Sequence, residues 1–371
     1  MRQAKVQDVV LPPRRRVVAV SDIHGNLPFL KGLLDKIGFS RADILVLVGD
    51  MIEKGPASLD TLHFIMELCR THTVYPVAGN CDDLVPEFAL GDGEGDAPFF
   101  LRYLSIRPQS TLRQMGALAG ADRADTLEDL ARLRRAVRER FMPELEFLRG
   151  LPTVVRTPEL LFVHGGVSDE EHPERLDAWH CMKNDDFRDQ RPHFRRWCVV
   201  GHWPVTLYRP EIPSAAPIVD VNQRLVSIDG GCVLKLDGQL NALMLPDARS
   251  QDFTWTAFDG RRVAEALADQ ADSVRSKNTR WSEHEVEVLA PGPEFSRCRH
   301  TATGYEMDIL TRYLKDPSAR FTTCEDATDY ELPVTAGDRL SIVEETSRGV
   351  LAKKHGVTGW YRGPLRWPKE S

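Results

Sequence analysis

The sequence predicts an α/β fold built on a parallel sheet, with small β domains after it. The first observation is that short, β-branched apolar runs alternate with segments of helical periodicity. The second is that three polar clusters, beginning at Asp22, Asp50 and Asn80, lie 28 and 30 residues apart, which is about the length of a βαβ unit. The third is a change, near Asp247, to alternating runs separated by turns, which is typical of small β domains.

The first strands and helices follow one another in regular order. Apolar runs at residues 17–20, 44–48 and 73–77 predict buried parallel strands. Helical spacing of apolar residues predicts helices over residues 30–37 and 59–69. Each strand ends directly before a polar cluster, and open α/β sheets bind ligands at the carboxyl ends of their strands. The sequence therefore predicts a functional site at this edge of the sheet.

A helical insertion is predicted over residues 84–148, because apolar residues from Leu127 to Val137 recur at helical spacing. Strand patterns then return before further polar clusters, at residues 160–163, 198–200 and 225–228. Alternating residues from Cys232 to Leu245 predict closing antiparallel strands. We expect the catalytic domain to span residues 1–247.

The remaining chain carries a weak internal repeat. Each copy has a β run, a turn-rich middle and a Gly-aromatic strand, at Gly304-Tyr305 in one copy and Gly359-Trp360 in the other. We expect a first β domain with its linker over residues 248–318 and a second over 326–371. The second resembles an SH3-like domain. Trp360 and Tyr305, the aromatic residues of the two copies, are expected in the core, with a peptide-binding groove as the alternative.

The bulk properties exclude several classes of protein. A length of 371 residues with 42% hydrophobic content predicts two or three domains with proper cores. No apolar run approaches the roughly 18 residues of a membrane span, and the net charge of −7 argues against a nucleic-acid-binding surface. The seven cysteines are scattered and form no Cys-x-x-Cys pair, so neither a disulfide framework nor a structural zinc site is indicated. A cytoplasmic location is expected, without a secretory signal.

Five short polar motifs occur in one order along the chain. They include an Asp-x-His-Gly, a Gly-Asp and a Gly-Asn-Cys-Asp motif, followed by His-Gly-Gly and Gly-His. Their oxygen and imidazole donors suit a pair of borderline divalent cations. Two cations about 3.5–4 Å apart clamp the attacking and leaving oxygens of a displacement and activate water. The chemistry that these donors predict is therefore hydrolysis. The six predicted metal ligands are Asp22, His24, Asp50, Asn80, His164 and His202.

Residues 17 to about 245 resemble the calcineurin-like metallophosphoesterases, whose fold is an α/β/β/α sandwich. The spacing of Gly49-Asp50 and Gly55 and the sequence His164-Gly165-Gly166 are similar to the phosphoprotein-phosphatase branch. Residues 199–204 and 229–232 resemble bacterial Ser/Thr protein phosphatases and symmetrical diadenosine tetraphosphatases.

This resemblance implies a role for each ligand. Asp22 and His24 would hold one metal, and Asn80, His164 and His202 the other, with Asp50 as the bridge. Manganese is the expected ion, with iron, zinc or nickel as alternatives. Many other phosphoesterases of this fold carry one more late histidine, where this chain has Trp203-Pro204.

Two positions depart from the family pattern. Lys54 stands where the protein phosphatases carry a phosphate-binding arginine, so it keeps the charge but loses the bidentate fork. Cys81 stands where they carry a histidine that, with a neighbouring acid, protonates the leaving oxygen, and a thiol is a poor substitute. A thiol that contacts substrate and an inert, buried thiol are equal interpretations of Cys81. Asp82, His180 and His193 are candidate replacement donors, and the sequence does not choose among them.

The predicted function is metal-dependent hydrolysis of phosphate esters, first of all by a phosphatase of the protein-phosphatase type. The alternatives are a diadenosine polyphosphate hydrolase and a phosphodiesterase, because good leaving groups need little protonation. The substrate would be a phosphorylated protein, nucleotide or small molecule. A second class is a scaffold or binding protein with a vestigial catalytic core and a peptide ligand on its SH3-like domain.

Overall fold

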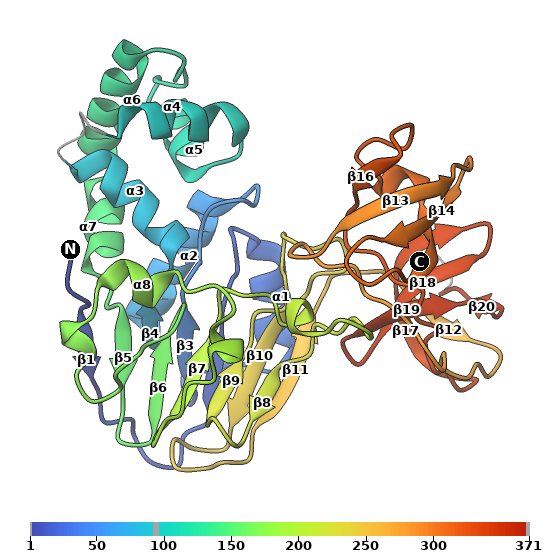
Figure 1. The fold of residues 1–371 in the computed structure, drawn as a ribbon. Helices are drawn as coiled ribbons and strands as arrows, with labels where there is room; N and C mark the ends of the chain where they lie inside the picture. The colour runs from blue at the N-terminus through green and yellow to red at the C-terminus, as the bar shows by residue number, and fades with distance from the viewer. Residues whose placement is uncertain (1, 92–95, 369–371) are drawn as a thin grey trace. The chain divides into compact units, whose positions relative to one another are not determined.

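The computed structural model describes residues 2–91 and 96–368 (Figure 1). The chain divides into two compact units. Unit 1 comprises Met1–Trp203, Pro217–Leu234 and Leu240–Phe258. Unit 2 comprises Pro204–Ala216, Lys235–Gln239 and Asp259–Ser371. The predicted domain ends, at residues 247, 318 and 326, stay predictions.

The first sheet of unit 1 contains the three predicted parallel strands and two antiparallel ones. Its order is β11-β10-β2-β3-β4, with β2, β3 and β4 parallel and β10 and β11 antiparallel to their neighbours. Two helices, α1 and α2, connect the parallel strands, as their apolar spacing predicts. The elements are β2 (Val17–Val20), α1 (Leu27–Lys36), β3 (Ile44–Val48), α2 (Ser58–Thr71), β4 (Thr73–Val77), β10 (Leu240–Leu245) and β11 (Thr254–Phe258).

The second sheet of unit 1 has six strands in the order β1-β5-β6-β7-β9-β8. Here the predicted strands at residues 160–163, 198–200 and 225–228 are confirmed within a residue or two. A short helix, α8 (Ala178–Met182), and the 3-10 turns Pro173–Arg175 and Phe187–Gln190 lie between β6 and β7. The strands are β1 (Val6–Asp8), β5 (Val154–Arg156), β6 (Leu160–Val163), β7 (Trp197–Val200), β8 (Ile218–Asp220) and β9 (Leu225–Ser227).

Alternation along the strands places one apolar face between the two sheets and the other against helices. Val17 and Ala19 of β2 share a core with Phe162 and Val199 of the second sheet. Val18 of β2 instead packs in the core that contains the helices. Successive side chains of a strand point to opposite faces, so both faces of the first sheet are covered. The predicted α/β/β/α sandwich is confirmed.

The predicted helical insertion is present between β4 and β5. Its helix α6 begins with a capping box, in which the Thr126 hydroxyl accepts from the Asp129 N–H and the Asp129 carboxylate accepts from the Thr126 N–H, at 3.1 Å each. The predicted apolar face of α6, including Leu130 and Val137, is buried. Residues 92–95 lie outside the described residues. The helices are α3 (Asn80–Leu90), α4 (Ala97–Ile106), α5 (Thr111–Leu118), α6 (Leu127–Arg140) and α7 (Met142–Gly150).

Unit 2 consists of two antiparallel sheets. One has the order β19-β18-β17-β12-β20 and the other β15-β14-β13-β16. Pairing among the described strands leaves both sheets open, so the predicted barrels are not confirmed and the SH3-like assignment stays a prediction. The strands are β12 (Val263–Ala266), β13 (Glu285–Ala290), β14 (Phe295–His300), β15 (Glu306–Leu310), β16 (Phe321–Thr323), β17 (Arg339–Thr346), β18 (Gly349–Lys354), β19 (Val357–Tyr361) and β20 (Leu365–Arg366).

The aromatic residue of the second repeat copy lies in the core of unit 2. Trp360 is 6% exposed, and its indole N–H donates to the Thr328 carbonyl at 2.7 Å. Its ring packs against Phe295 of the other sheet. Trp360 therefore serves packing, which was the first of the two interpretations.

Unit 2 also includes two short segments from the middle of the chain. Residues 204–216, which contain the 3-10 turn Val205–Tyr208, bond to the C-terminal part. Asn278 donates its N–H to the Pro210 carbonyl at 2.9 Å, and Thr358 donates to Pro213 at 3.0 Å. In residues 235–239, the Asp237 carbonyl accepts from the Lys353 ammonium at 2.8 Å. The chain thus leaves unit 1 and returns twice before it enters β12.

None of the helices in residues 2–91 and 96–368 has the length and apolar character that a membrane crossing requires.

Candidate metal centre

The predicted metal ligands lie on loops at the carboxyl ends of strands from both sheets of unit 1. Asp22 and His24 follow β2, Asp50 follows β3, and Asn80 is the first residue of α3 after β4. In the second sheet, His164 follows β6 and His202 follows β7. Parallel strands end at the same edge, so residues far apart in the sequence are brought to one place.

Glycines precede several of these ligands because the loops approach one another closely. A Cβ on Gly79 would lie 2.2 Å from the backbone nitrogen and a carboxylate oxygen of Asp50. A Cβ on Gly201 would lie 2.4 Å from an Asp22 carboxylate oxygen. Only a residue without a side chain fits at such distances. The glycines of Gly-Asn and Gly-His therefore allow the loops to converge.

The loops hold four of the ligands in left-handed backbone conformations. The φ angles are 54° at Asp22, 49° at His24, 48° at Asp50 and 67° at His202. Such conformations are uncommon for non-glycine residues, and each costs about 1–3 kcal/mol. Hydrogen bonds between the loops hold them: the Asp22 N–H donates to Gly49 at 3.0 Å and the His24 N–H to Asp50 at 2.9 Å. Backbone strain of this kind gathers at functional sites.

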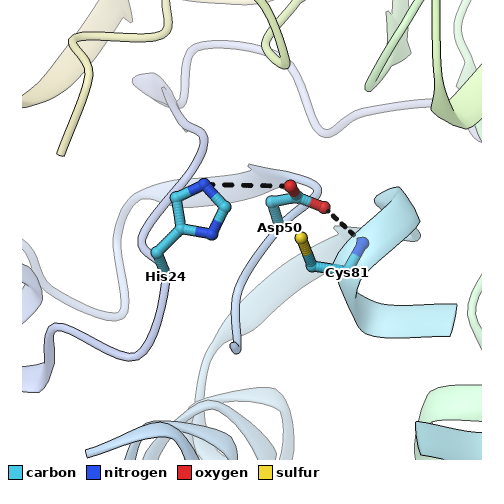
Figure 2. Close-up of side chains that lie close together, drawn as sticks. All are labelled: His24, Asp50 and Cys81. Atoms are coloured by element: carbon cyan, nitrogen blue, oxygen red, sulfur yellow. Dashed lines mark hydrogen bonds and ion pairs between the residues drawn. The ribbon is translucent and has the colours of Figure 1, made fainter. Parts of the chain in front are cut away.

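The side chains converge around Asp50. Its Oδ1 lies 3.3 Å from His164 Nε2. Its Oδ2 lies 3.8 Å from His24 Nε2, the contact that a dashed line marks in Figure 2. Asp22 Oδ1 lies 3.8 Å from His24 Nε2 and 4.0 Å from His164 Nε2. The His202 N–H donates to Asp22 Oδ2 at 3.0 Å. Two overlapping groups of possible metal ligands result, one formed by His24, Asp50 and Cys81 and the other by Asp50, His164 and His202.

Several buried donor and acceptor atoms at this site have no hydrogen-bond partner among the described residues. A buried polar group without a partner costs about 1–3 kcal/mol. Cations would satisfy the oxygens, His164 Nε2 and one of the two ring nitrogens of His24, so the donor set fits the divalent ions that the family resemblance implies. The atoms are Asp22 Oδ1, His24 Nδ1 and Nε2, Asn80 Oδ1 and His164 Nε2.

Two of the histidines are oriented by hydrogen bonds on the ring nitrogen away from the site. His164 Nδ1 lies 2.9 Å from the Val48 carbonyl, which leaves Nε2 facing Asp50. His202 Nε2 lies 2.8 Å from the carboxylate of Asp185, which leaves Nδ1 for a ligand. Metal-binding histidines usually make such a bond, because it fixes the tautomer and the ring orientation.

The electrostatics of the site act differently on its three histidines. Burial would lower the pKa of His164, but Asp50 and Asp22 outweigh it and raise that pKa to about 10. Burial lowers the pKa of His24 to about 3 and that of His202 to about 4. Burial would also raise the pKa of Asp50, but His164 outweighs it and holds it below its usual range.

Lys54 and Cys81 both lie beside the predicted ligands. Burial would lower the pKa of the Lys54 ammonium, but neighbouring acidic groups, among them the carboxylates of Asp50 and Asp22, outweigh it and raise that pKa. Lys54 is therefore a cation within an acidic site. Cys81 is 3% exposed, and its N–H donates to Asp50 Oδ1 at 2.8 Å. Burial raises the pKa of its thiol well above the usual range, so the sulfur is protonated.

The three candidate proton donors differ in their surroundings. Asp82 accepts backbone N–H groups from Met51 and Gly79 at 2.9 Å and from Ile52 at 3.2 Å, so both of its oxygens tie loops together. His180 has an exposed side chain that faces Asp177 at 3.3 Å. His193 is also exposed, 3.0 Å from the Arg191 carbonyl. Burial and the charge of Asp50 raise the pKa of Asp82 to about 7, and the choice among the three candidates stays a prediction.

Three acidic residues at the site received no role from the sequence. Glu53 is fully buried and accepts from the Tyr103 hydroxyl at 2.5 Å and from the Thr111 N–H at 2.9 Å. Asp229 is also fully buried, with one oxygen 2.7 Å from the Gly231 N–H and the other unpartnered. The third is Asp185, the partner of His202. The position of Glu53 between Asp50 and Lys54 in the sequence could have indicated that it lies at the site. Asp185 lies in an irregular segment, where no neighbouring motif indicates its role.

Comparison with known proteins supports the same interpretation. The sequence profile described as calcineurin-like phosphoesterase matches residues 15–224. The bis(5'-nucleosyl)-tetraphosphatase PrpE [asymmetrical] of Halalkalibacterium halodurans is 24% identical over 251 residues, which cover 62% of this chain and 89% of that protein. A bis(5'-nucleosyl)-tetraphosphatase, symmetrical, of Neisseria meningitidis serogroup A is 32% identical over 150 residues, which cover 40% of this chain and 42% of that protein.

Two solved structures are similar in part. A serine/threonine phosphatase of Saccharomyces cerevisiae with similarity to human PP5 is 11% identical, with a TM-score of 0.41, covering 70% of this chain and 84% of that one. A metallophosphoesterase of Sphaerobacter thermophilus is 18% identical, with a TM-score of 0.36, covering 67% and 89%. The profile match, which extends over more than half of the residues, shows that the chain belongs to the calcineurin-like phosphoesterase family and is a hydrolase acting on phosphoester bonds.

Proposed function

We propose that this hydrolase uses two divalent cations to cleave dinucleoside polyphosphates. The observation that carries the proposal is the group of buried, unpartnered oxygen and nitrogen atoms around Asp50. Asp22, His24 and Asp50 would hold one cation, and Asp50, Asn80, His164 and His202 the other. Bound cations of this kind supply Lewis-acid activation of water and neutralise phosphate charge.

The choice of substrate rests on the surroundings of the leaving group. Cys81 stands in place of the histidine that the resemblance implies as proton donor, and a cysteine is a poor substitute for that histidine. Asp82 is held by three backbone N–H groups. A leaving nucleotide phosphate departs as a stable anion and needs little protonation, in contrast to an alkyl alcohol. The names of the relatives from H. halodurans and N. meningitidis support the same substrate class.

Within the site, Lys54 would bind a phosphate oxygen. Its ammonium is charged and lies near Asp50 and Cys81. A lysine binds phosphate as a point charge, without the paired hydrogen bonds of an arginine. The chain would therefore orient its substrate mainly through the cations.

The test is a comparison of substrates on the full chain. Chelator-treated protein is supplied with manganese, iron, zinc or nickel, and turnover of diadenosine tetraphosphate is compared with that of phosphotyrosine and phosphoserine peptides. We expect manganese to support activity and the dinucleotide to be cleaved fastest. Fastest turnover of a phosphopeptide would instead favour the protein-phosphatase function. Faster cleavage of a bis-aryl phosphate than of the corresponding aryl phosphate monoester would favour a phosphodiesterase. Asp50→Asn is the inactive control.

The second candidate class, a scaffold with a vestigial core, predicts a different result. Such a chain would take up no manganese, iron or zinc on titration and would turn over none of these substrates. The unpartnered ligand atoms argue against it, because a site without a cation would leave them all unsatisfied.

A further inference from the structure

The sulfur of Cys81 lies within the group of atoms that would hold the first cation. Ligand atoms of His24, Asp50 and Cys81 all lie within 4.8 Å of one another, and all three residues are buried. Figure 2 shows the sulfur turned toward the side of Asp50 that carries its carboxylate. The sequence suggested a substrate contact or an inert thiol at this position, and neither interpretation includes a bond to metal.

Independent evidence for a ligand at this point comes from the neighbouring side chains. His24 is completely buried, yet neither of its ring nitrogens has a hydrogen-bond partner. Asp22 Oδ1, which is 3.8 Å from His24 Nε2, is likewise buried and unpartnered. These atoms need a partner whatever residue stands at position 81.

The backbone holds Cys81 in place. Its N–H donates to Asp50 Oδ1 at 2.8 Å, so the residue at the start of α3 is tied to the central carboxylate. The Asn80 amide donates to the sulfur at 3.5 Å, and an acceptor sulfur is better suited to that bond as a thiolate. The sulfur already lies within 4.8 Å of the ligand atoms of His24 and Asp50, so no large movement is needed for it to join the group.

We propose that Cys81 binds the first cation as a thiolate, together with Asp22, His24 and Asp50. This inference rests on the proposed two-cation function. On binding, the S–H bond breaks, a sulfur–metal bond forms, and the proton leaves to solvent. Thiolate and imidazole ligands favour zinc, iron(II) and cobalt over manganese and magnesium. The first site therefore prefers a softer metal than the second, whose predicted ligands are oxygen and nitrogen only.

Cobalt spectroscopy tests the bond directly. Chelator-treated full chain is titrated with Co²⁺, and the near-ultraviolet sulfur-to-cobalt charge-transfer band is recorded for the wild type, Cys81→Ser and the control Cys69→Ala. Cys69 is a half-buried cysteine on α2, so this control removes a thiol away from the site. We expect the band in the wild type and in Cys69→Ala and its loss in Cys81→Ser. A band of unchanged intensity in Cys81→Ser would overturn the proposal.

A second measurement needs no variant at position 81. X-ray absorption of the zinc-loaded wild type should show one sulfur at about 2.3 Å from zinc, and absence of sulfur would overturn the proposal. Competition between zinc and manganese should shift toward manganese in Cys81→Ser by about tenfold or more. If neither cobalt nor zinc binds at all, the two-cation function itself fails. Metal binding without a sulfur ligand removes only the role of Cys81.

Discussion

Two histidines of this chain are equally buried but differ in the hydrogen bonds of their ring nitrogens. His24 of unit 1 is 0% exposed and His300 of unit 2 is 1% exposed. His300 has a partner for each ring nitrogen, with Nδ1 2.9 Å from the Thr303 hydroxyl and Nε2 2.9 Å from the Glu283 carbonyl. His24 has none. Burial alone therefore does not mark a functional histidine, whereas a buried ring without partners indicates that something else binds there.

The largest effect is expected at the residue that both ligand groups share. Asp50→Asn should lower turnover by about a thousandfold, because it weakens both predicted cation sites and several kcal/mol of transition-state stabilisation depend on them. Elemental analysis should find less than the full complement of metal. Chelation of the wild type should cause a similar loss that added cation restores, whereas Asp50→Asn should not recover. Full activity in the variant would contradict the assignment of Asp50.

The two histidines themselves give the sharpest comparison. His300→Ala breaks two hydrogen bonds and should destabilise unit 2 by about 2 kcal/mol more than His24→Ala destabilises metal-free unit 1, since each bond is worth about 1 kcal/mol. Both variants remove the same side chain from an equally buried position. Unfolding is measured in chelator, and metal uptake is measured separately. Only His24→Ala should lose metal, and loss of metal in His300→Ala would break the comparison.

A pH series tests how strongly the carboxylates beside His164 stabilise its charged form. The pKa of His164 is raised to about 10 in the metal-free protein, against an ordinary value of 6.5. The folded state binds the proton more tightly, so its stabilising effect is complete below pH 6.5 and is lost as the pH rises toward 10. Unfolding in urea with chelator should show this fall, and His164→Gln should reduce it. An identical fall in the variant would assign it to other groups.

The smallest effect is expected at a buried acid that does have partners. Tyr103→Phe removes the hydroxyl that donates to Glu53, in the turn between Asp50 and Lys54. We expect a loss of about 1–2 kcal/mol in stability and a rise of a few-fold in KM, with kcat nearly unchanged. Tyr305→Phe removes a similar bond to Asp329 in unit 2 and should leave KM unchanged. Equal KM values for Tyr103→Phe and the wild type would limit Glu53 to a structural role.

The sequence predicted the strands and motifs of unit 1 because both are local signals. Runs such as Ile44–Val48 predict a buried strand, and Gly49-Asp50 follows it directly. Partners that depend on packing could not be predicted in this way. Glu53 accepts a hydrogen bond from Tyr103, which is 50 residues away in the sequence and lies on helix α4 of the insertion. His202 meets Asp185 only because the segment after β6 folds back toward β7.

The C-terminal part was harder to predict for a related reason. The alternating runs of β13 and β17 indicate strands correctly, but local alternation does not say which strands pair. β12 lies between β17 and β20 in one sheet, although more than seventy residues separate it from β17. The expected closed barrels depend on those long-range pairings, so the pattern could not determine them.

The interleaved course of the backbone has a practical consequence for anyone who wishes to study the phosphoesterase part in isolation. Truncation after Phe258 would remove the hydrogen-bond partners of residues 204–216 and 235–239. Asn278 and Lys353 are two of these partners. No single stop codon yields an intact catalytic fragment. The phosphoesterase part and the C-terminal sheets are therefore best expressed together, as one chain.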